Sequence, residues 1–392
     1  MLQLILILVL CGWLAAGAFL YWNARGVRVL RPGTSLPMPN PAPRVSILVA
    51  ARNEEKTLPA TLTSLLKLDY PEYEIILVDD DSTDSTPAIA DAFAGSYQAR
   101  GRLQVIHNHE LPPGWRGKVH ALSLAEKASA GDWLLATDAD VVLHPALLRL
   151  AISLANQTGA SLVSIAPQLD FGCFAERAVL PVFSFLLALA FPLRLVNRPD
   201  SRCALGVGAF LLMRRDDLRA LGGYEQLRGA LVEDLRMAQM FKRSGRAIHL
   251  AVGRDLFRTR MYDNWREMFE GLARTAFEGT GFSVRNTVVG LVLGLGGAVL
   301  PWVTLLGLLL SAFNHGTPLR HDPPFLLAAA TAGVSLLVYA PLVAFLGLSP
   351  LYAFALPLAT LFYSAAVVTS AILTLAGPGV RWKDRMYPHP PV

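Results

Sequence analysis

Long uncharged apolar segments constrain this 392-residue chain more than any other feature of its sequence. Residues 1–24, 287–313 and 324–376 contain no Asp, Glu, Lys or Arg. A helix of about 20 apolar residues crosses the hydrocarbon core of a bilayer, so these segments are long enough for one span at the N-terminus and about three near the C-terminus. Only 17% of the residues are charged, which is below the roughly 25% of globular chains. We therefore expect a membrane protein.

The N-terminal apolar segment is predicted to be an uncleaved anchor. It lacks a basic region before its apolar core, and the core exceeds the roughly 7–15 residues of a signal peptide. Arg25, Arg28 and Arg31 follow it, and basic residues favour the cytoplasmic side of a membrane. The chain after residue 24 is therefore expected in the cytoplasm, at the cell membrane.

The remaining sequence divides by composition. We expect a Pro-rich linker at 25–43, a cytoplasmic domain at 44–285, about three membrane helices within 286–376 and a basic tail at 377–392. Within the domain, 178–194 is apolar but holds Pro181 and Pro192, which limit a continuous helix. A span there would separate the acidic residues on either side of it, so an interfacial segment on the bilayer surface is favoured.

The tail conflicts with this topology. Arg381, Lys383 and Arg385 favour the cytoplasm, whereas three full spans after a cytoplasmic domain place the C-terminus outside. Either one apolar stretch is re-entrant or the tail breaks the positive-inside rule.

Charge and cysteine content exclude other classes of protein. The formal net charge of +5 comes mainly from residues that flank apolar segments, so no nucleic-acid partner is expected. The three cysteines lie far apart without a Cys-x-x-Cys pair, and five of the histidines (His107, His109, His120, His144 and His249) show no ligand spacing. Zinc sites and disulfide frameworks therefore have no support.

Three apolar runs within the domain alternate with helical patterns. The runs are 45–49, 74–78 and 133–137, and the helical patterns are 58–68 and 86–93. Continuous apolar strands that alternate with helices predict an α/β fold with a mostly parallel sheet covered on both faces.

Polar clusters follow all three predicted strands. They are Arg52-Asn53-Glu54-Glu55, Asp79-Asp80-Asp81-Ser82 and Asp138-Ala139-Asp140. Ligands of such sheets bind outside the carboxyl ends of the strands, so this edge is the predicted site.

The pair Asp138 and Asp140 suits a divalent cation. Carboxylates held close together repel one another unless a cation compensates them, and Mg²⁺ or Mn²⁺ bound to carboxylates also bridges the phosphates of a substrate. The alternative is a chance Asp-x-Asp without a role.

Other candidate residues each have a structural alternative. Asp79 and Asp80 suit contacts to a nucleoside or cap the next helix, and Lys118 supplies charge to a diphosphate or is a solvated surface lysine. Glu233 and Asp234 offer a general base or interact with a helix dipole. Arg260 closes over a diphosphate or belongs to an interfacial belt.

Five motifs in order resemble the pattern of family 2 glycosyltransferases of GT-A fold, over about 44–280. They are Arg52-Asn53-Glu54-Glu55, Val78-Asp79-Asp80-x-Ser82-Thr83-Asp84, Thr137-Asp138-Ala139-Asp140, Gly222-Gly223-Tyr224 and Glu233-Asp234. Gly114-Trp115-x-Gly117-Lys118 and Arg260-Met261-Tyr262 look most like the hopene-associated and carotenoid (diaponeurosporenoate-type) branch.

The resemblance implies a hexosyltransferase with a nucleotide-diphosphate sugar donor, a UDP-sugar being favoured, and a single inverting displacement. It places Glu54, Asp79 and Asp80 at the nucleoside. It places Asp138 and Asp140 at the metal and diphosphate, and Asp234 as the base beside Glu233.

The Q-x-x-R-W motif of processive synthases does not occur after Glu233-Asp234. Transfer of one sugar to a membrane lipid (an isoprenoid, a hopanoid or another glycolipid acceptor) is therefore favoured. The alternatives are a processive polysaccharide synthase and a catalytically inactive membrane scaffold.

Overall fold

The computed structural model describes residues 1–99, 101–230, 232–262, 264–316, 318–319, 321–376, 380–382 and 385–387. The chain forms two compact units. One comprises Gly26–Asp170 and Phe191–Arg260, and the other comprises Met1–Arg25, Phe171–Ala190 and Met261–Val392. The expected 44–285 domain is thus divided, because 171–190 and 261–285 group with the apolar helices.

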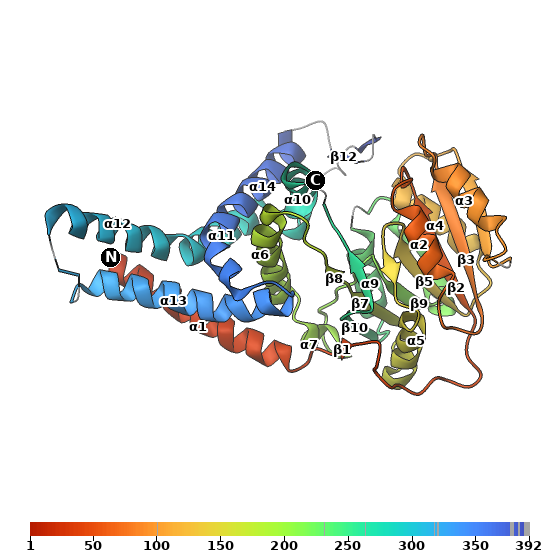
Figure 1. Ribbon diagram of the computed structural model, residues 1–392, viewed down its shortest axis with the longest axis horizontal. Helices are drawn as coiled ribbons and strands as arrows, with labels where there is room; N and C mark the ends of the chain where they lie inside the picture. The colour runs from red at the N-terminus through yellow and green to blue at the C-terminus, as the bar shows by residue number, and fades with distance from the viewer. Residues whose placement is uncertain are drawn as a thin grey trace. The chain divides into compact units, whose positions relative to one another are not determined.

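An eight-stranded sheet forms the centre of the first of these units (Figure 1). Its order is β1 (Val29–Leu30), β10 (Ile248–Gly253), β7 (Leu162–Ala166), β9 (Leu211–Arg214), β5 (Trp133–Asp138), β2 (Val45–Ala51), β3 (Tyr73–Asp80) and β4 (Leu103–Asn108). Strand β9 is antiparallel to both neighbours, and all other pairs are parallel. The predicted mostly parallel sheet is confirmed, and its three predicted strands are neighbours in it.

Helices cover both faces of the sheet (Figure 1). They are α2 (Leu58–Leu65), α3 (Thr86–Ala94), α4 (Gly117–Ala128), α5 (Leu147–Thr158), α7 (Leu193–Val196), α8 (Arg215–Ala220), the 3₁₀ helix η1 (Gly223–Leu227) and α9 (Glu233–Arg243). Alternate residues of one strand enter different cores: Ile47 packs with α2 and α5, whereas Leu48 packs with α4 and α9. This alternation explains why the strands carry apolar residues on both faces of the sheet.

A three-stranded sheet follows the end of β5. Its order is β6 (Val142–Leu143), β11 (Phe257–Thr259) and β8 (Gln168–Leu169). Arg258 pairs with Val142 in the antiparallel β6–β11 ladder. Arg260 lies two residues after Arg258, and Asp140 lies two residues before Val142. Because the two strands are antiparallel, both residues lie at the same end of the ladder.

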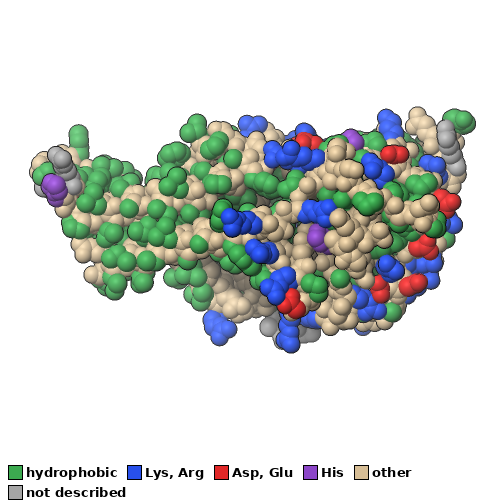
Figure 2. Space-filling model, turned by 90° about the horizontal axis from the view of Figure 1, so that it is seen from below, with side chains coloured by type: hydrophobic (Ala, Val, Ile, Leu, Met, Phe, Trp, Pro, Cys, Tyr) green, Lys and Arg blue, Asp and Glu red, His purple; other side chains and the backbone are tan. Residues whose placement is uncertain are grey.

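The second unit is helical. It contains α1 (Leu2–Ala24), α6 (Phe174–Ala190), α10 (Trp265–Gly279), α11 (Val284–Ala298), α12 (Leu300–His315), α13 (Pro323–Phe345), η2 (Pro350–Ala355) and α14 (Leu356–Ala376), followed by β12 (Val380–Trp382) and β13 (Arg385–Tyr387). Four helical segments of the described chain are long and apolar enough to cross a membrane: Leu2–Ala24, Val284–His315, Pro323–Phe345 and Pro350–Ala376. Hydrophobic side chains dominate the visible surface of the helices at one end of Figure 2.

Helix α6 continues through Pro181 and ends before Pro192, so the expectation that Pro181 limits a helix is wrong. Burial of α6 against α1 and α14 offsets the hydrogen bond that Pro181 cannot donate. In the tail, Arg381 and Arg385 lie in β12 and β13, whereas Lys383 lies outside the described residues.

Candidate active site

The loops after β2 and β3 are joined by reciprocal hydrogen bonds. Ser82 Oγ accepts from the Asn53 N–H at 3.0 Å, and Asn53 Oδ1 accepts from the Thr83 N–H at 2.9 Å. The Glu54 N–H donates to Thr86 Oγ1 at 2.7 Å. The two polar motifs therefore hold each other in place at the carboxyl ends of adjacent strands, where the sequence placed the site.

Glu54 also acts at the start of α2. Its Oε2 accepts from Thr57 Oγ1 at 2.7 Å, and Thr57 is the residue that precedes the helix. The structure therefore places the Glu54 carboxylate at the start of α2, where the helix dipole favours a negative charge.

Asp79 and Asp80 end β3 and are almost fully buried, with 1% and 2% exposure. Two residues at the end of β4 form hydrogen bonds with these carboxylates. Asn108 Nδ2 donates to Asp80 Oδ1 at 3.2 Å, and His107 Nδ1 lies 3.3 Å from Asp79 Oδ2. The carboxylates are thus held between strands. Sequence reasoning missed His107 and Asn108 as part of this group, since only the β3–β4 register pairs them with Asp79 and Asp80.

His107 also reaches a second carboxylate. Its Nε2 lies 3.1 Å from Asp91 Oδ1. Burial lowers the pKa of His107, but its bonds to Asp91 and Asp79 outweigh that effect and leave the pKa raised above its ordinary value. His107 therefore favours a protonated state that bridges two acids.

Lys118 brings two acidic motifs together. Its Nζ lies 2.6 Å from Asp138 Oδ1 at the end of β5 and 2.6 Å from Glu233 Oε1 at the start of α9. Burial lowers the pKa of Lys118, but the charges of Asp138 and Glu233 more than offset it and hold the pKa well above its usual value. Lys118 stands in the first turn of α4, where the helix dipole disfavours a cation. The two carboxylates compensate for that position.

Asp234 lies beside this ion pair and has an unusual pKa. Burial and the charge of Glu233 raise it to about 7, against the opposing effects of Lys118 and two backbone N–H groups. These N–H groups belong to Leu235, which donates to Oδ1 at 2.7 Å, and Gly208, which donates to Oδ2 at 2.7 Å. A carboxylate whose pKa is near neutrality suits a general base.

Residues 206–208 pack directly against the start of α9. A Cβ atom on Gly206 would lie 2.6 Å from the Asp234 carbonyl oxygen, and one on Gly208 would lie 3.3 Å from Asp234 Oδ2. At 206 only glycine allows so close an approach to backbone, and at 208 any larger residue would require the neighbouring side chains to shift. Sequence reasoning missed both glycines; the Gly-x-Gly spacing was the available signal, but it is too common to be specific.

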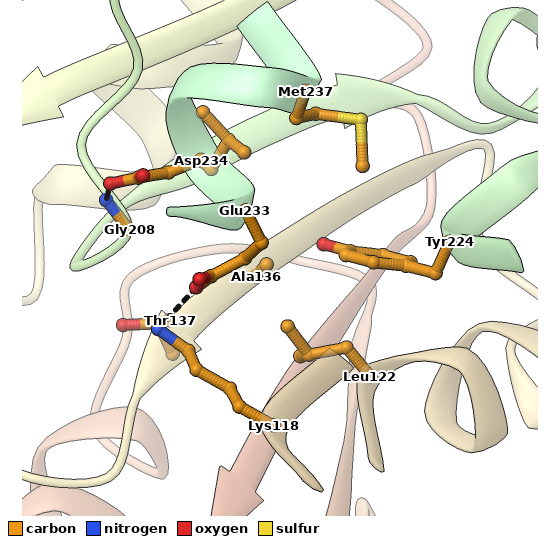
Figure 3. Close-up of a pocket in the computed structure, with 10 residues that line it drawn as sticks. Lys118, Leu122, Ala136, Thr137, Gly208, Tyr224, Glu233, Asp234 and Met237 are labelled. Atoms are coloured by element: carbon orange, nitrogen blue, oxygen red, sulfur yellow. Dashed lines mark hydrogen bonds and ion pairs between the residues drawn. The ribbon is translucent and has the colours of Figure 1, made fainter. Parts of the chain in front are cut away.

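A small pocket opens among these groups (Figure 3). Its lining residues are Lys118, Leu122, Ala136, Thr137, Gly208, Leu211, Tyr224, Glu233, Asp234 and Met237. The wall away from the charged groups is apolar except for the Tyr224 hydroxyl. This oxygen is buried, and it has no hydrogen-bond partner among the described residues. An unsatisfied buried hydroxyl costs about 1–3 kcal/mol.

Other predicted site residues lie outside this pocket. Asp140 is exposed after β5, and the side chain of Asp138 is 32% exposed. Arg260 is exposed after β11, at the end of the ladder that leads back to Asp140. No cluster of three or more His, Cys, Asp or Glu side chains suited to a metal occurs among the residues described.

The solved structures define the class of fold. The chain is similar to a mannosyltransferase from Pyrobaculum calidifontis solved with GDP-Man and Mn²⁺, with a TM-score of 0.55 and 21% identity over 92% of this chain and 99% of the other. The mostly parallel sheet with its flanking helices is therefore a GT-A fold.

The sequence comparison names the family. Residues 46–222 match the family model described as Glycosyl transferase family 2. The chain carries a family 2 glycosyltransferase domain, and the resemblance inferred from its motifs is confirmed.

Two curated relatives are similar over different lengths. A 4,4'-diaponeurosporenoate glycosyltransferase of Staphylococcus haemolyticus is 26% identical over 280 residues, which are 69% of this chain and 70% of the relative. A beta-monoglucosyldiacylglycerol synthase of Synechocystis is 37% identical over 114 residues, which are 29% of this chain and only 23% of the relative. The second match therefore concerns part of the domain alone.

Proposed function

We propose that this glycosyltransferase transfers one sugar from a nucleotide-diphosphate sugar to a membrane lipid with inversion at the anomeric carbon. One observation carries the proposal: the Asp234 carboxyl group, which lies beside the Lys118–Glu233 ion pair, has a pKa of about 7. Such a group is ionised for much of its time at neutral pH and retains enough basicity to accept a proton.

Asp234 acts as the base in this proposal. Its carboxylate takes the proton of the acceptor hydroxyl while the acceptor oxygen forms a bond to the anomeric carbon. The bond between that carbon and the diphosphate breaks, and the diphosphate leaves with the bonding electron pair. The N–H groups of Gly208 and Leu235 orient the carboxylate throughout.

Asp138 and Asp140 are proposed to hold Mg²⁺ or Mn²⁺. Mg²⁺ needs only one or two protein carboxylates when water and substrate phosphates complete its shell, so two partly exposed carboxylates in sequence proximity fit the ion. When bound, the ion would offset the charge that develops on the departing diphosphate. The mannosyltransferase of similar fold was itself solved with Mn²⁺.

The donor is proposed to lie along the carboxyl ends of β2, β3 and β5, with a UDP-sugar favoured. Because Asp79 and Asp80 are buried, we propose that they shape the backbone that meets the nucleoside, together with Glu54. Lys118 and Arg260 supply positive charge for the diphosphate. Arg260 follows β11, the strand that pairs with β6, and it therefore lies at the same end of this ladder as Asp140.

The acceptor is proposed to be a lipid and the protein a multi-pass protein of the cell membrane with its catalytic unit in the cytoplasm. Four described helical segments are long and apolar enough to span a bilayer. Both curated relatives bear names of enzymes that glycosylate lipids. Without the Q-x-x-R-W motif, a single transfer is favoured over polymer synthesis.

The test uses membranes that contain the full-length chain. Membranes are incubated with a panel of nucleotide sugars, with and without EDTA, and extracted lipids are analysed by mass spectrometry. We expect a lipid that gains the mass of one sugar, loss of the product with EDTA and recovery with Mn²⁺ or Mg²⁺. A ladder of products would show a polymer synthase, and transfer that survives full chelation would contradict the metal assignment. No product in the wild type, or full activity in Asp234→Asn, would contradict the proposed chemistry.

A further inference from the structure

The Tyr224 side chain is held rigidly in the catalytic unit. It follows Gly222 and Gly223, whose φ angles of 90° and 67° are in the left-handed region that favours glycine. Its backbone N–H donates to Glu126 Oε2 at 3.0 Å, and the residue is only 1% exposed. The ring therefore cannot turn toward solvent without moving η1.

The hydroxyl of this ring points into the pocket that also contains Lys118, Glu233 and Asp234 (Figure 3). It is a buried polar atom with no hydrogen-bond partner among the described residues. Buried polar groups are nearly always bonded in folded proteins. An exception inside a candidate active site indicates a partner that is present in another state of the site.

The surrounding charges decide which kind of partner the hydroxyl can have. Burial, together with the nearby carboxylates of Glu233, Glu126 and Asp234, raises its pKa well above the ordinary value. The phenol therefore stays protonated and acts as a hydrogen-bond donor. Carboxylates are the strongest acceptors that line this pocket.

In the structure Lys118 forms an ion pair with Glu233, with Nζ 2.6 Å from Oε1. Under the proposed function, the donor diphosphate draws this ammonium group toward its own charge, and the ion pair with Glu233 weakens. Glu233 would then be a partly buried carboxylate beside the base Asp234. A fixed donor is needed to keep Glu233 from competing for the proton.

We propose that the Tyr224 hydroxyl is the hydrogen-bond donor that holds the Glu233 carboxylate when the donor diphosphate engages Lys118. This inference rests on the proposed function, since it requires a diphosphate at Lys118. Tyr224 is then a positioning residue: it contacts neither sugar nor acceptor, and it acts on the reaction through Glu233.

Tyr224→Phe tests the inference because it removes one oxygen and leaves the ring. In the purified full-length protein we expect kcat to fall about tenfold, which corresponds to the loss of one modest hydrogen bond. The donor KM should rise as well, because the bond forms when the diphosphate binds and is absent from the variant. Tyr339→Phe is the matched control, since it removes another buried hydroxyl without a described partner, from α13 of the helical unit. It should leave both constants unchanged.

A second measurement does not depend on turnover. UDP or GDP with Mn²⁺ should raise the melting temperature of the wild type more than that of Tyr224→Phe, because only the wild type gains the new bond. In a Glu233→Met background, which has no oxygen to accept the bond, the Tyr224→Phe change should have little further effect on this shift, as expected for two residues that act as a pair.

The outcomes separate the inference from the proposed function. A kcat equal to that of the wild type, an equal nucleotide-induced shift, or an undiminished effect in the Glu233→Met background each overturns the role of Tyr224. Full activity in Asp234→Asn, or no shift with either nucleotide in the wild type, overturns the proposed function instead.

Discussion

The backbone N–H of Gly208, a residue without a Cβ atom, donates to Asp234 Oδ2 at 2.7 Å (Figure 3). This contact joins the segment before β9 to the first turn of α9. It fixes one oxygen of the proposed base and lowers the pKa of Asp234 against the larger effect of burial. The orientation of the base thus depends on a residue that carries no side chain.

Gly208→Ala is expected to reduce activity without unfolding the protein. The new Cβ would lie 3.3 Å from both Asp234 Oδ2 and Lys118 Nζ, so these groups must shift by a few tenths of an ångström. We expect kcat to fall about tenfold, because misplacement of a catalytic group by less than 1 Å is costly. Gly33→Ala is the control, since a Cβ there meets no atom within 4 Å. Unchanged kcat in Gly208→Ala would show that this contact does not orient the base.

The pH dependence of kcat should reflect Asp234. The base acts as the carboxylate, and its pKa is raised to about 7, so kcat should rise about tenfold per pH unit below 7 and level off above it. Asp234→Asn should lower kcat about 10²–10⁴-fold and remove this limb of the profile. The control Asp216→Asn changes an exposed acid in the first turn of α8. A wild-type profile that is flat between pH 5 and pH 8 would contradict the assignment.

Lys118→Met should destabilise the catalytic unit. It leaves Asp138 and Glu233 without their shared cation, and breaking a largely buried ion pair of this kind costs about 3 kcal/mol. Lys118→Met/Glu233→Gln should be more stable than Lys118→Met alone, because the double variant has one uncompensated charge fewer. The measurement is the melting temperature of the purified protein, with the exposed Lys127→Met as control. A melting temperature for Lys118→Met equal to that of the wild type would show that the pair contributes nothing.

His107 should stabilise the protein more at acidic than at alkaline pH. Its pKa in the folded state is raised by Asp91 and Asp79 against the effect of burial. Its stabilisation is therefore fully present below the unfolded-state pKa of about 6.5 and is lost as pH rises through the folded-state pKa.

The corresponding experiment compares wild type and His107→Gln by thermal unfolding at pH 6 and pH 9. The difference in free energy of unfolding should be about 0.5–1 kcal/mol larger at pH 6, a modest value because the imidazole is 33% exposed. His109→Gln, which changes a side chain that is 74% exposed, is the matched control. An equal difference at both pH values would mean that His107 is not charged in the folded state.

Much of the fold could be predicted from local patterns. The continuous apolar runs ending near Val49, Val78 and Thr137 predicted a parallel sheet, and β2, β3 and β5 are neighbours in the structure. The uncharged segments predicted the four apolar helical segments. Hydrophobic periodicity and charge-free length are properties of short windows of sequence, so they are readable without knowledge of tertiary contacts.

The partners of the candidate site residues could not be predicted in this way. The sequence placed acidic residues at strand ends, but it did not show that Lys118 bridges Asp138 and Glu233 or that His107 bridges Asp79 and Asp91. It offered Asp79 and Asp80 for nucleoside contact or for capping the next helix, and it did not show that both carboxylates lie buried between strands.

The sequence by itself determined that this chain alternates strands with helices, collects acids at one sheet edge and carries helices apolar enough for a bilayer. Only the tertiary structure decided which acid stands beside which base. Lys118 and Glu233 are 115 positions apart in the chain, and their contact follows from how α4 and α9 pack on one face of the sheet. Packing of this kind also sets burial, and burial gives Asp234 its raised pKa.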